Sequence, residues 1–153
     1  MKTNLLALLV LVLCATGCTR EGAILRREER LIGAWEIDRV TYKRDFALFA
    51  ENITDEYAGD VMEFYSDYSA AYDDSSLGAV FFGSWYLLYE EDSYWSEDGD
   101  VSDLDWHLDA NFYDDVANEE FFFFGDINRL TQNRLNFEML DARGEFRFRL
   151  RKI

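Results

Sequence analysis

The chain has 153 residues, of which 49% are hydrophobic and 17% aromatic, so it can bury the core of one ordinary domain. Its 31 acidic and 15 basic side chains give a net charge of −16, which argues against a nucleic-acid partner because most of the surface would repel phosphates. The absence of proline excludes collagen-like and proline-rich chains.

The first residues have the pattern of an export signal. Lys2 supplies a positive charge, and residues 5–15 follow without any charge. As a helix this run would be about 16 Å long, too short to cross a hydrocarbon core of about 30 Å. The small residues 15–17 precede Cys18, and this run resembles the bacterial lipobox, in which the cysteine becomes the new N-terminus and carries acyl chains. The resemblance implies a signal peptide over 1–17 and lipid attachment at Cys18.

This resemblance also predicts where the protein is located. Two or more acyl chains hold a protein stably to a membrane, so we expect Cys18 to anchor it there. Thr19 follows the cysteine, whereas aspartate at that place would favour the inner membrane, so we expect an outer-membrane position in the cell envelope. Residues 18–30 are then the lipidated N-terminus and a charged tether with one or two helical turns. With Cys14 removed and Cys18 acylated, no cysteine remains for a disulfide or a metal site.

Residues 31–153 are predicted to form one all-β domain. Apolar and polar residues alternate in runs separated by turn signals, the pattern of an antiparallel sheet or barrel. The alternation is clearest in the last two runs, where residues 142–144 turn the chain between them. The expected strands span 33–43, 60–66, 69–74, 79–90, 103–109, 119–127, 133–140 and 145–152.

Three segments deviate from simple alternation. In 45–59, Phe46, Phe49, Ile53 and Tyr57 have helical spacing, so we expect a short helix packed over the sheet or one barrel mouth. The runs 80–88 and 121–124 are apolar on both faces of a strand. Either the 45–59 segment or a long loop covers their outer face, or they form an exposed aromatic patch for a partner.

Charge is distributed unevenly along the chain. Residues 45–128 hold 23 acidic side chains and no lysine or arginine, whereas the flanking segments are rich in both signs. In a closed barrel the first and last strands are neighbours, so the basic ends would form one stripe. We expect Glu36 and Asp38 within reach of Arg147 or Arg149 on that stripe.

A family resemblance supports the barrel. Gly33-Ala34-Trp35 resembles the Gly-x-Trp signature of lipocalin-like barrels, and residues 127–135 are similar to a stretch of bacterial lipocalin-like lipoproteins. The resemblance implies an antiparallel lipocalin-like β-barrel of about eight strands with one or two short helices. It implies that 35–41 pair with 145–151 and that Trp35 closes one end under a basic residue of the last strand. The candidates for this basic residue are Arg147, Arg149 and Arg151.

Catalytic and metal-binding chemistry find little support. His107, the only histidine, is expected to point outward between Asp105 and Asp109, and no nucleophile accompanies it. The acidic run 98–109 departs from an EF-hand, because Asp103 occupies the place of the required glycine. We therefore expect no enzyme, no metal site and no cofactor, with calcium binding by the acidic loop 90–105 as the alternative left open.

The sequence favours a membrane-anchored, non-catalytic binding module for a small apolar ligand held in the barrel or at its mouth. The alternative is a structural or protein-interaction lipoprotein of the cell envelope with a filled barrel. Aromatic residues on the predicted strands would contact the ligand: Trp35, Phe64, Trp85, Phe122, Phe137 and Phe148.

Overall fold

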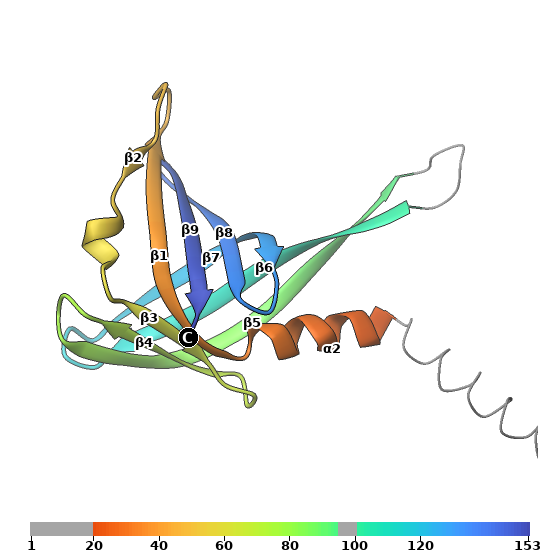
Figure 1. Cartoon of the computed structure of the whole chain (residues 1–153), viewed down its shortest axis with the longest axis horizontal. Coiled ribbons are helices and arrows are strands. Elements are labelled where there is room, and N and C mark those ends of the chain that lie inside the picture. Colours follow the sequence, from red (N-terminus) through yellow and green to blue (C-terminus); the bar gives the residue numbers. More distant parts are fainter. Residues whose placement is uncertain (1–19, 95–100) are drawn as a thin grey trace, which may run out of the picture.

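A computed structural model describes residues 20–94 and 101–153 (Figure 1). Within these two ranges, one α-helix precedes nine strands, and a short 3-10 helix lies between the second and third strands. The elements are α2 (Arg20–Leu31), β1 (Gly33–Arg44), β2 (Glu51–Asn52), η2 (Thr54–Tyr57), β3 (Val61–Phe64), β4 (Ser69–Asp74), β5 (Ala79–Tyr94), β6 (Val101–Asp114), β7 (Glu119–Leu130), β8 (Arg134–Asp141) and β9 (Gly144–Lys152). None of the described helices is long and apolar enough to cross a membrane.

The strands form a closed antiparallel barrel, which confirms the predicted fold class. From β3 to β9 each strand pairs with the next in sequence, and β1 pairs with both β3 and β9 to close the ring. The barrel therefore contains eight strands, with β2 as a two-residue addition to one end of β1. The β5–β6 hairpin is longer than the others and extends beyond the barrel as an arm (Figure 1).

The closing pair has the predicted partners. Trp35 lies opposite Lys152, Val40 opposite Phe148 and Thr41 opposite Arg147. The register shifts between Ile37 and Arg39, where β1 contains a β-bulge. The basic ends of the chain therefore do lie side by side on the barrel.

The segment before the barrel differs from a tether. Residues 20–31 form one continuous helix of 12 residues, about 18 Å long, where an extended segment of that length would reach about 40 Å. Packing explains the helix, because Leu31 is completely buried, Ile24 packs against the core and the Arg27 guanidinium lies 4.5 Å from the Trp106 ring centroid. Residues 1–19, including Cys18, lie outside the described residues.

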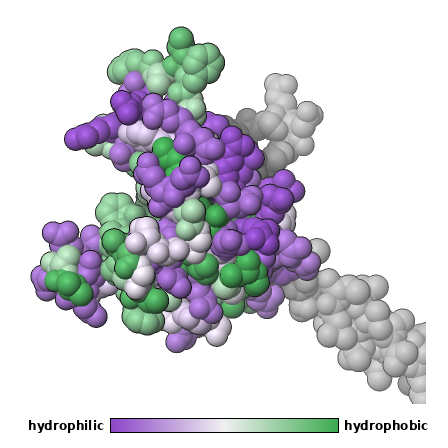
Figure 2. All heavy atoms as spheres, turned by 60° about the vertical axis from the view of Figure 1, so that its left-hand side comes forward, coloured by the Kyte–Doolittle hydropathy of each residue, from purple (hydrophilic) through white to green (hydrophobic). Residues whose placement is uncertain are grey.

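The predicted helix over 45–59 was wrong. The chain instead forms a hairpin between β1 and β2, followed by the one-turn helix η2. Thr54 explains the difference, because it hydrogen-bonds both the N–H and the carbonyl of Val40 through its hydroxyl and ties this segment to β1. The apolar residues at the hairpin tip are exposed and form the hydrophobic cluster at the top of Figure 2: Phe46, Leu48 and Phe49.

Candidate functional site

Five of the six aromatic residues proposed as ligand contacts lie in the barrel interior. Trp35, Phe64, Trp85 and Phe137 have no exposed surface, and Phe148 is 1% exposed. A side chain that lines a cavity wide enough for water keeps some accessible surface, because a water molecule can touch it. These five side chains therefore belong to a packed core rather than to the wall of a cavity in this structure.

Direct ring contacts fill the interior. The Phe137 and Phe148 rings stack with centroids 4.8 Å apart, and Phe123 meets Phe148 edge-on at 5.6 Å. Phe64 and Trp85 pack edge-on at 5.8 Å. Such pairs stabilise a core beyond the area that they bury. The aromatic residues that could have held an apolar ligand contact one another instead.

The sixth residue, Phe122, points away from the interior. It is 63% exposed, whereas Phe123, its neighbour on β7, is buried. Successive side chains of a strand point to opposite faces, and the run 121–124 is apolar at every position, so its sequence alone does not assign the faces. The sequence left the face of Phe122 open, and the structure places its side chain on the outer surface.

Phe122 belongs to an exposed set of apolar side chains on the outer surface of β5, β6 and β7, which we call the aromatic face. Its members are 39 to 67% exposed: Val80, Phe82, Tyr86, Leu88, Tyr113, Phe122 and Phe124. The segment 45–59 does not cover this face, since β2 and η2 lie against β1. Of the two alternatives for these runs, the exposed patch is the one found in the structure.

Phe82 is the most exposed member of this face. It borders three open depressions of about 220, 290 and 680 Å³, and it lies opposite Tyr113, which in turn lies opposite Glu120. Each depression has at least one carboxylate in its wall, and none has a lysine or arginine. The carboxylates are Glu63, Asp67, Asp114, Asp115 and Glu120.

His107 lies on the outer surface, as expected, but with a different partner. Its Nδ1 is 2.7 Å from Asp126 Oδ1 on the neighbouring strand β7, and its ring stacks on Phe124. Its other ring nitrogen, Nε2, is buried and has no hydrogen-bond partner. A general base needs an accessible nitrogen, so this arrangement does not present His107 to a substrate.

The barrel end beneath α2 is closed by Trp35 and Lys152. The Lys152 Nζ lies 5.0 Å from the Trp35 ring centroid and donates to the carbonyl oxygens of Arg30, at 3.0 Å, and Ile32, at 2.6 Å. The Trp35 indole N–H donates to the Leu31 carbonyl at 2.7 Å. Both side chains thus satisfy carbonyls at the C-terminal end of the helix.

The basic residue over Trp35 is therefore Lys152, and the expectation of Arg147, Arg149 or Arg151 was wrong. Lys152 is the residue of β9 directly opposite Trp35, so its position in the register selects it. Burial lowers the pKa of Lys152 below its ordinary value.

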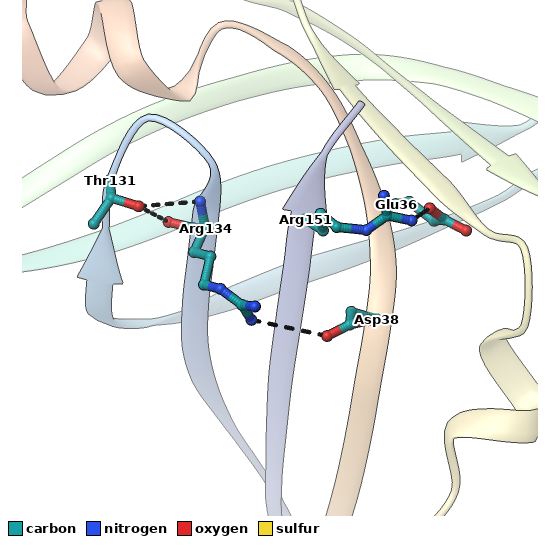
Figure 3. Close-up of polar contacts among 5 residues, drawn as sticks. All are labelled: Glu36, Asp38, Thr131, Arg134 and Arg151. Atoms are coloured by element: carbon teal, nitrogen blue, oxygen red, sulfur yellow. Dashed lines mark hydrogen bonds and ion pairs between the residues drawn. The ribbon is translucent and has the colours of Figure 1, made fainter.

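The ion pairs of the basic stripe also differ from those expected. Arg151 pairs with Glu36, and Arg134 of β8 lies 3.9 Å from Asp38 (Figure 3). Arg147 pairs instead with Glu138, at 3.3 Å, and with Glu145. The bulge in β1 shifts the register, so the partner of each acidic residue depends on an irregularity that alternation does not reveal.

One buried polar cluster was not anticipated. Asp60 is 1% exposed and accepts hydrogen bonds from the Tyr72 hydroxyl and from the Ser75 backbone N–H, the latter at 2.9 Å. Burial and the Asp60 carboxylate raise the pKa of Tyr72 far above its ordinary value. Because the carboxylate is partnered on both oxygens, it is a structural group of the barrel rather than an available base.

Comparisons with known proteins assign no family to this arrangement. No family model matches the chain, and neither a curated protein nor a solved structure is significantly similar to it. Within 20–94 and 101–153, histidine, cysteine and acidic side chains form no group of three or more that could hold a metal ion. Residues 95–100, which include Asp98 and Asp100 of the acidic run 98–109, lie outside those ranges.

Proposed function

We propose that this protein is a non-catalytic interaction lipoprotein of the cell envelope, anchored through acylated Cys18 in the outer membrane, which docks a protein partner on the aromatic face. One observation carries the proposal: aromatic side chains fill the barrel, while others remain exposed together outside it. This is the filled-barrel alternative of the sequence analysis, and the packed rings favour it over an interior site for a small apolar ligand.

The aromatic face has the composition of a protein interface. Soluble proteins rarely expose large contiguous apolar patches, and those that do occur mark binding surfaces. Phenylalanine and tyrosine are enriched in the cores of such interfaces, and they bury much area with little loss of conformational freedom. Five aromatic side chains lie on three adjacent strands: Phe82 and Tyr86 on β5, Tyr113 on β6, and Phe122 and Phe124 on β7. Asn111 and Asp109 of β6 lie between the β5 and β7 members, so the face combines aromatic with polar groups.

The helix α2 would give the anchored protein a defined position. It begins at Arg20, two residues after Cys18, and its last residues are held against the barrel by Lys152 and Trp35. A helix of this length would set the barrel about 18 Å from the start of α2. The anchored barrel would therefore be held near the membrane by a rigid element.

Photocrosslinking tests this proposal in cells that produce the full chain. A photoreactive phenylalanine analogue replaces Phe82 in one variant and Phe46 in another, because Phe46 is an equally aromatic, fully exposed residue far from the aromatic face. We expect a discrete protein adduct from position 82 that is absent from position 46. In a second arm, Phe122→Ser should remove the adduct at position 82, whereas Phe49→Ser should leave it. Equal adducts at both positions, or none at position 82, would contradict the proposal.

A further inference from the structure

Three arginine side chains lie in one row across the outer surface of the barrel. Arg39 of β1 lies directly opposite Arg149 of β9, Arg149 opposite Asn136 of β8, and Asn136 opposite Arg129 of β7. The arginines are exposed, and side chains directly opposite one another in a sheet have Cβ atoms about 4.5–5.5 Å apart. We call these four residues the arginine row.

The side chains of these three arginines have no hydrogen-bond or ion-pair partner among residues 20–94 and 101–153, although the chain has about twice as many acidic as basic side chains. Their neighbours are neutralised: Arg134 lies near Asp38 and Arg151 pairs with Glu36 (Figure 3). Like charges directly opposite each other destabilise a sheet. The repulsion between Arg39 and Arg149 therefore lowers the stability of this part of the sheet.

Two β-bulges bring Arg39 and Arg129, at the two ends of the row, onto the outer surface. The register shifts between Ile37 and Arg39 in β1 and again between Ile127 and Arg129 in β7. Strict alternation from Ile37 or Ile127, which both pack toward the core, would turn Arg39 and Arg129 inward. Bulges often re-aim a side chain beside a functional site, and here two of them present an arginine on the same side of Arg149 and Asn136.

The Asn136 side chain adds an unsatisfied group to the row. Its carboxamide oxygen is buried and has no hydrogen-bond partner. That oxygen is an acceptor and does not bind an anion, whereas the NH2 group of the same carboxamide carries two donors that can reach a phosphate oxygen.

We propose that the arginine row binds a phosphate group, carried either by a soluble phosphate compound or by a phospholipid headgroup. Planar guanidinium groups match the oxygens of phosphate bidentately, and a tetrahedral anion between adjacent strands can reach two of them at once. The nearest carboxylates already have cationic partners, because Asp38, next to Arg39, faces Arg134, and Glu138, two residues from Asn136, faces Arg147. Charges more than about 8 Å away are largely screened at physiological salt. The site is separate from the aromatic face and does not depend on a protein partner.

Thermal unfolding of the full chain tests the proposal. The midpoint is measured in inorganic phosphate and in chloride at equal ionic strength, for the original protein and for Arg149→Gln, Asn136→Asp and Arg143→Gln. Arg143 lies exposed in the β8–β9 turn, so its variant removes the same charge away from the row. At ten times the dissociation constant, phosphate should raise the midpoint by about 5 °C relative to chloride. The shift should survive in Arg143→Gln and disappear in the two row variants.

Arg149→Gln provides a second readout in chloride alone. Removing one of two opposed charges should raise its midpoint by about 1–3 °C, so the loss of the phosphate response is not a folding defect.

Vesicles of phosphatidylcholine, with and without phosphatidylglycerol, distinguish the two sources of the phosphate group. A response to phosphatidylglycerol but not to free phosphate identifies a lipid headgroup, and the reverse identifies a soluble ligand. No response to either phosphate source, or equal responses in Arg149→Gln and Arg143→Gln, would overturn the proposal.

Discussion

The contacts of Lys152 predict a measurable role for one ammonium group in closing the barrel. Lys152→Met keeps the apolar stem and removes the charge that lies over Trp35 and donates to the carbonyls of Arg30 and Ile32. Hydrogen bonds from charged donors contribute about 1.5–3 kcal/mol each, and an exposed cation–π contact about 0.5–1 kcal/mol. The sum of these contributions is an upper bound. In the variant, water can hydrate the exposed carbonyl of Arg30, and in the original protein the Lys152 ammonium loses part of its own hydration on folding. Its lowered pKa reflects that desolvation.

We therefore expect Lys152→Met to lower the free energy of unfolding by about 2 kcal/mol and the midpoint by about 6–8 °C. Urea denaturation followed by circular dichroism measures the free energy, and Lys43→Met, an exposed residue of the same charge, serves as the control. The control should change stability by less than about 0.5 kcal/mol. In a double-mutant cycle with Trp35→Phe, the effects should be non-additive, because both residues hold the end of α2. Equal losses in Lys152→Met and Lys43→Met would refute this reasoning.

Three destabilising substitutions and one exposed control test other parts of the barrel. Gly33→Ala should destabilise by about 1–3 kcal/mol in urea denaturation, because Gly33 has φ of 125° and a Cβ there would lie 2.7 Å from a side-chain carbon of the neighbouring strand. Tyr72→Phe leaves one oxygen of buried Asp60 without a donor and should cost about 1–3 kcal/mol at pH 7. The raised pKa of Tyr72 means that the unfolded chain ionises first, so stability should fall as the pH rises above 10, and less steeply in Tyr72→Phe. Phe148→Ala should cost about 3–5 kcal/mol, whereas Phe46→Ser should change stability by less than about 0.5 kcal/mol.

The fold could be predicted because its signals are local. Alternation in 133–140 and 145–152 places one residue in two toward the core, and the structure has strands β8 and β9 there. The pairing of β1 with β9 followed from the resemblance around Trp35 together with closure of the barrel. The interior positions of Phe137 and Phe148 follow from the same alternation, whereas Trp85 lies in a run that is apolar on both faces, so its side was not predicted.

What the sequence did not predict depends on register and on competing local structure. Phe46 and Phe49 have helical spacing by coincidence, because Thr54 and the β1–β2 pairing fix that segment as a hairpin. In 121–124 every residue is apolar, so the inward register and the outward register look the same. Lys152 was missed as the residue over Trp35 because three arginines precede it at nearby positions and the register was unknown.

The arginine row illustrates the same limit. Alternation alone would place Arg39 and Arg129 toward the interior, where a charged side chain is costly. Each strand avoids that cost with one extra residue, and the bulges appear only when both strands of a pair are placed. Sites created by irregular pairing are thus invisible to a periodicity argument.

Native and denaturing mass spectrometry of the protein purified from cells that make it tests most directly the claim that its aromatic interior is a core. The account predicts a mass equal to residues 18–153 plus acyl chains, with no apolar molecule released from the barrel interior when the native protein is denatured. Because Trp35, Phe137 and Phe148 already contact other side chains on every side, a bound apolar molecule would have to displace them. Release of a stoichiometric apolar molecule on denaturation, retained in Phe122→Ser but lost in Phe148→Ala, would contradict the account and restore a ligand-binding barrel.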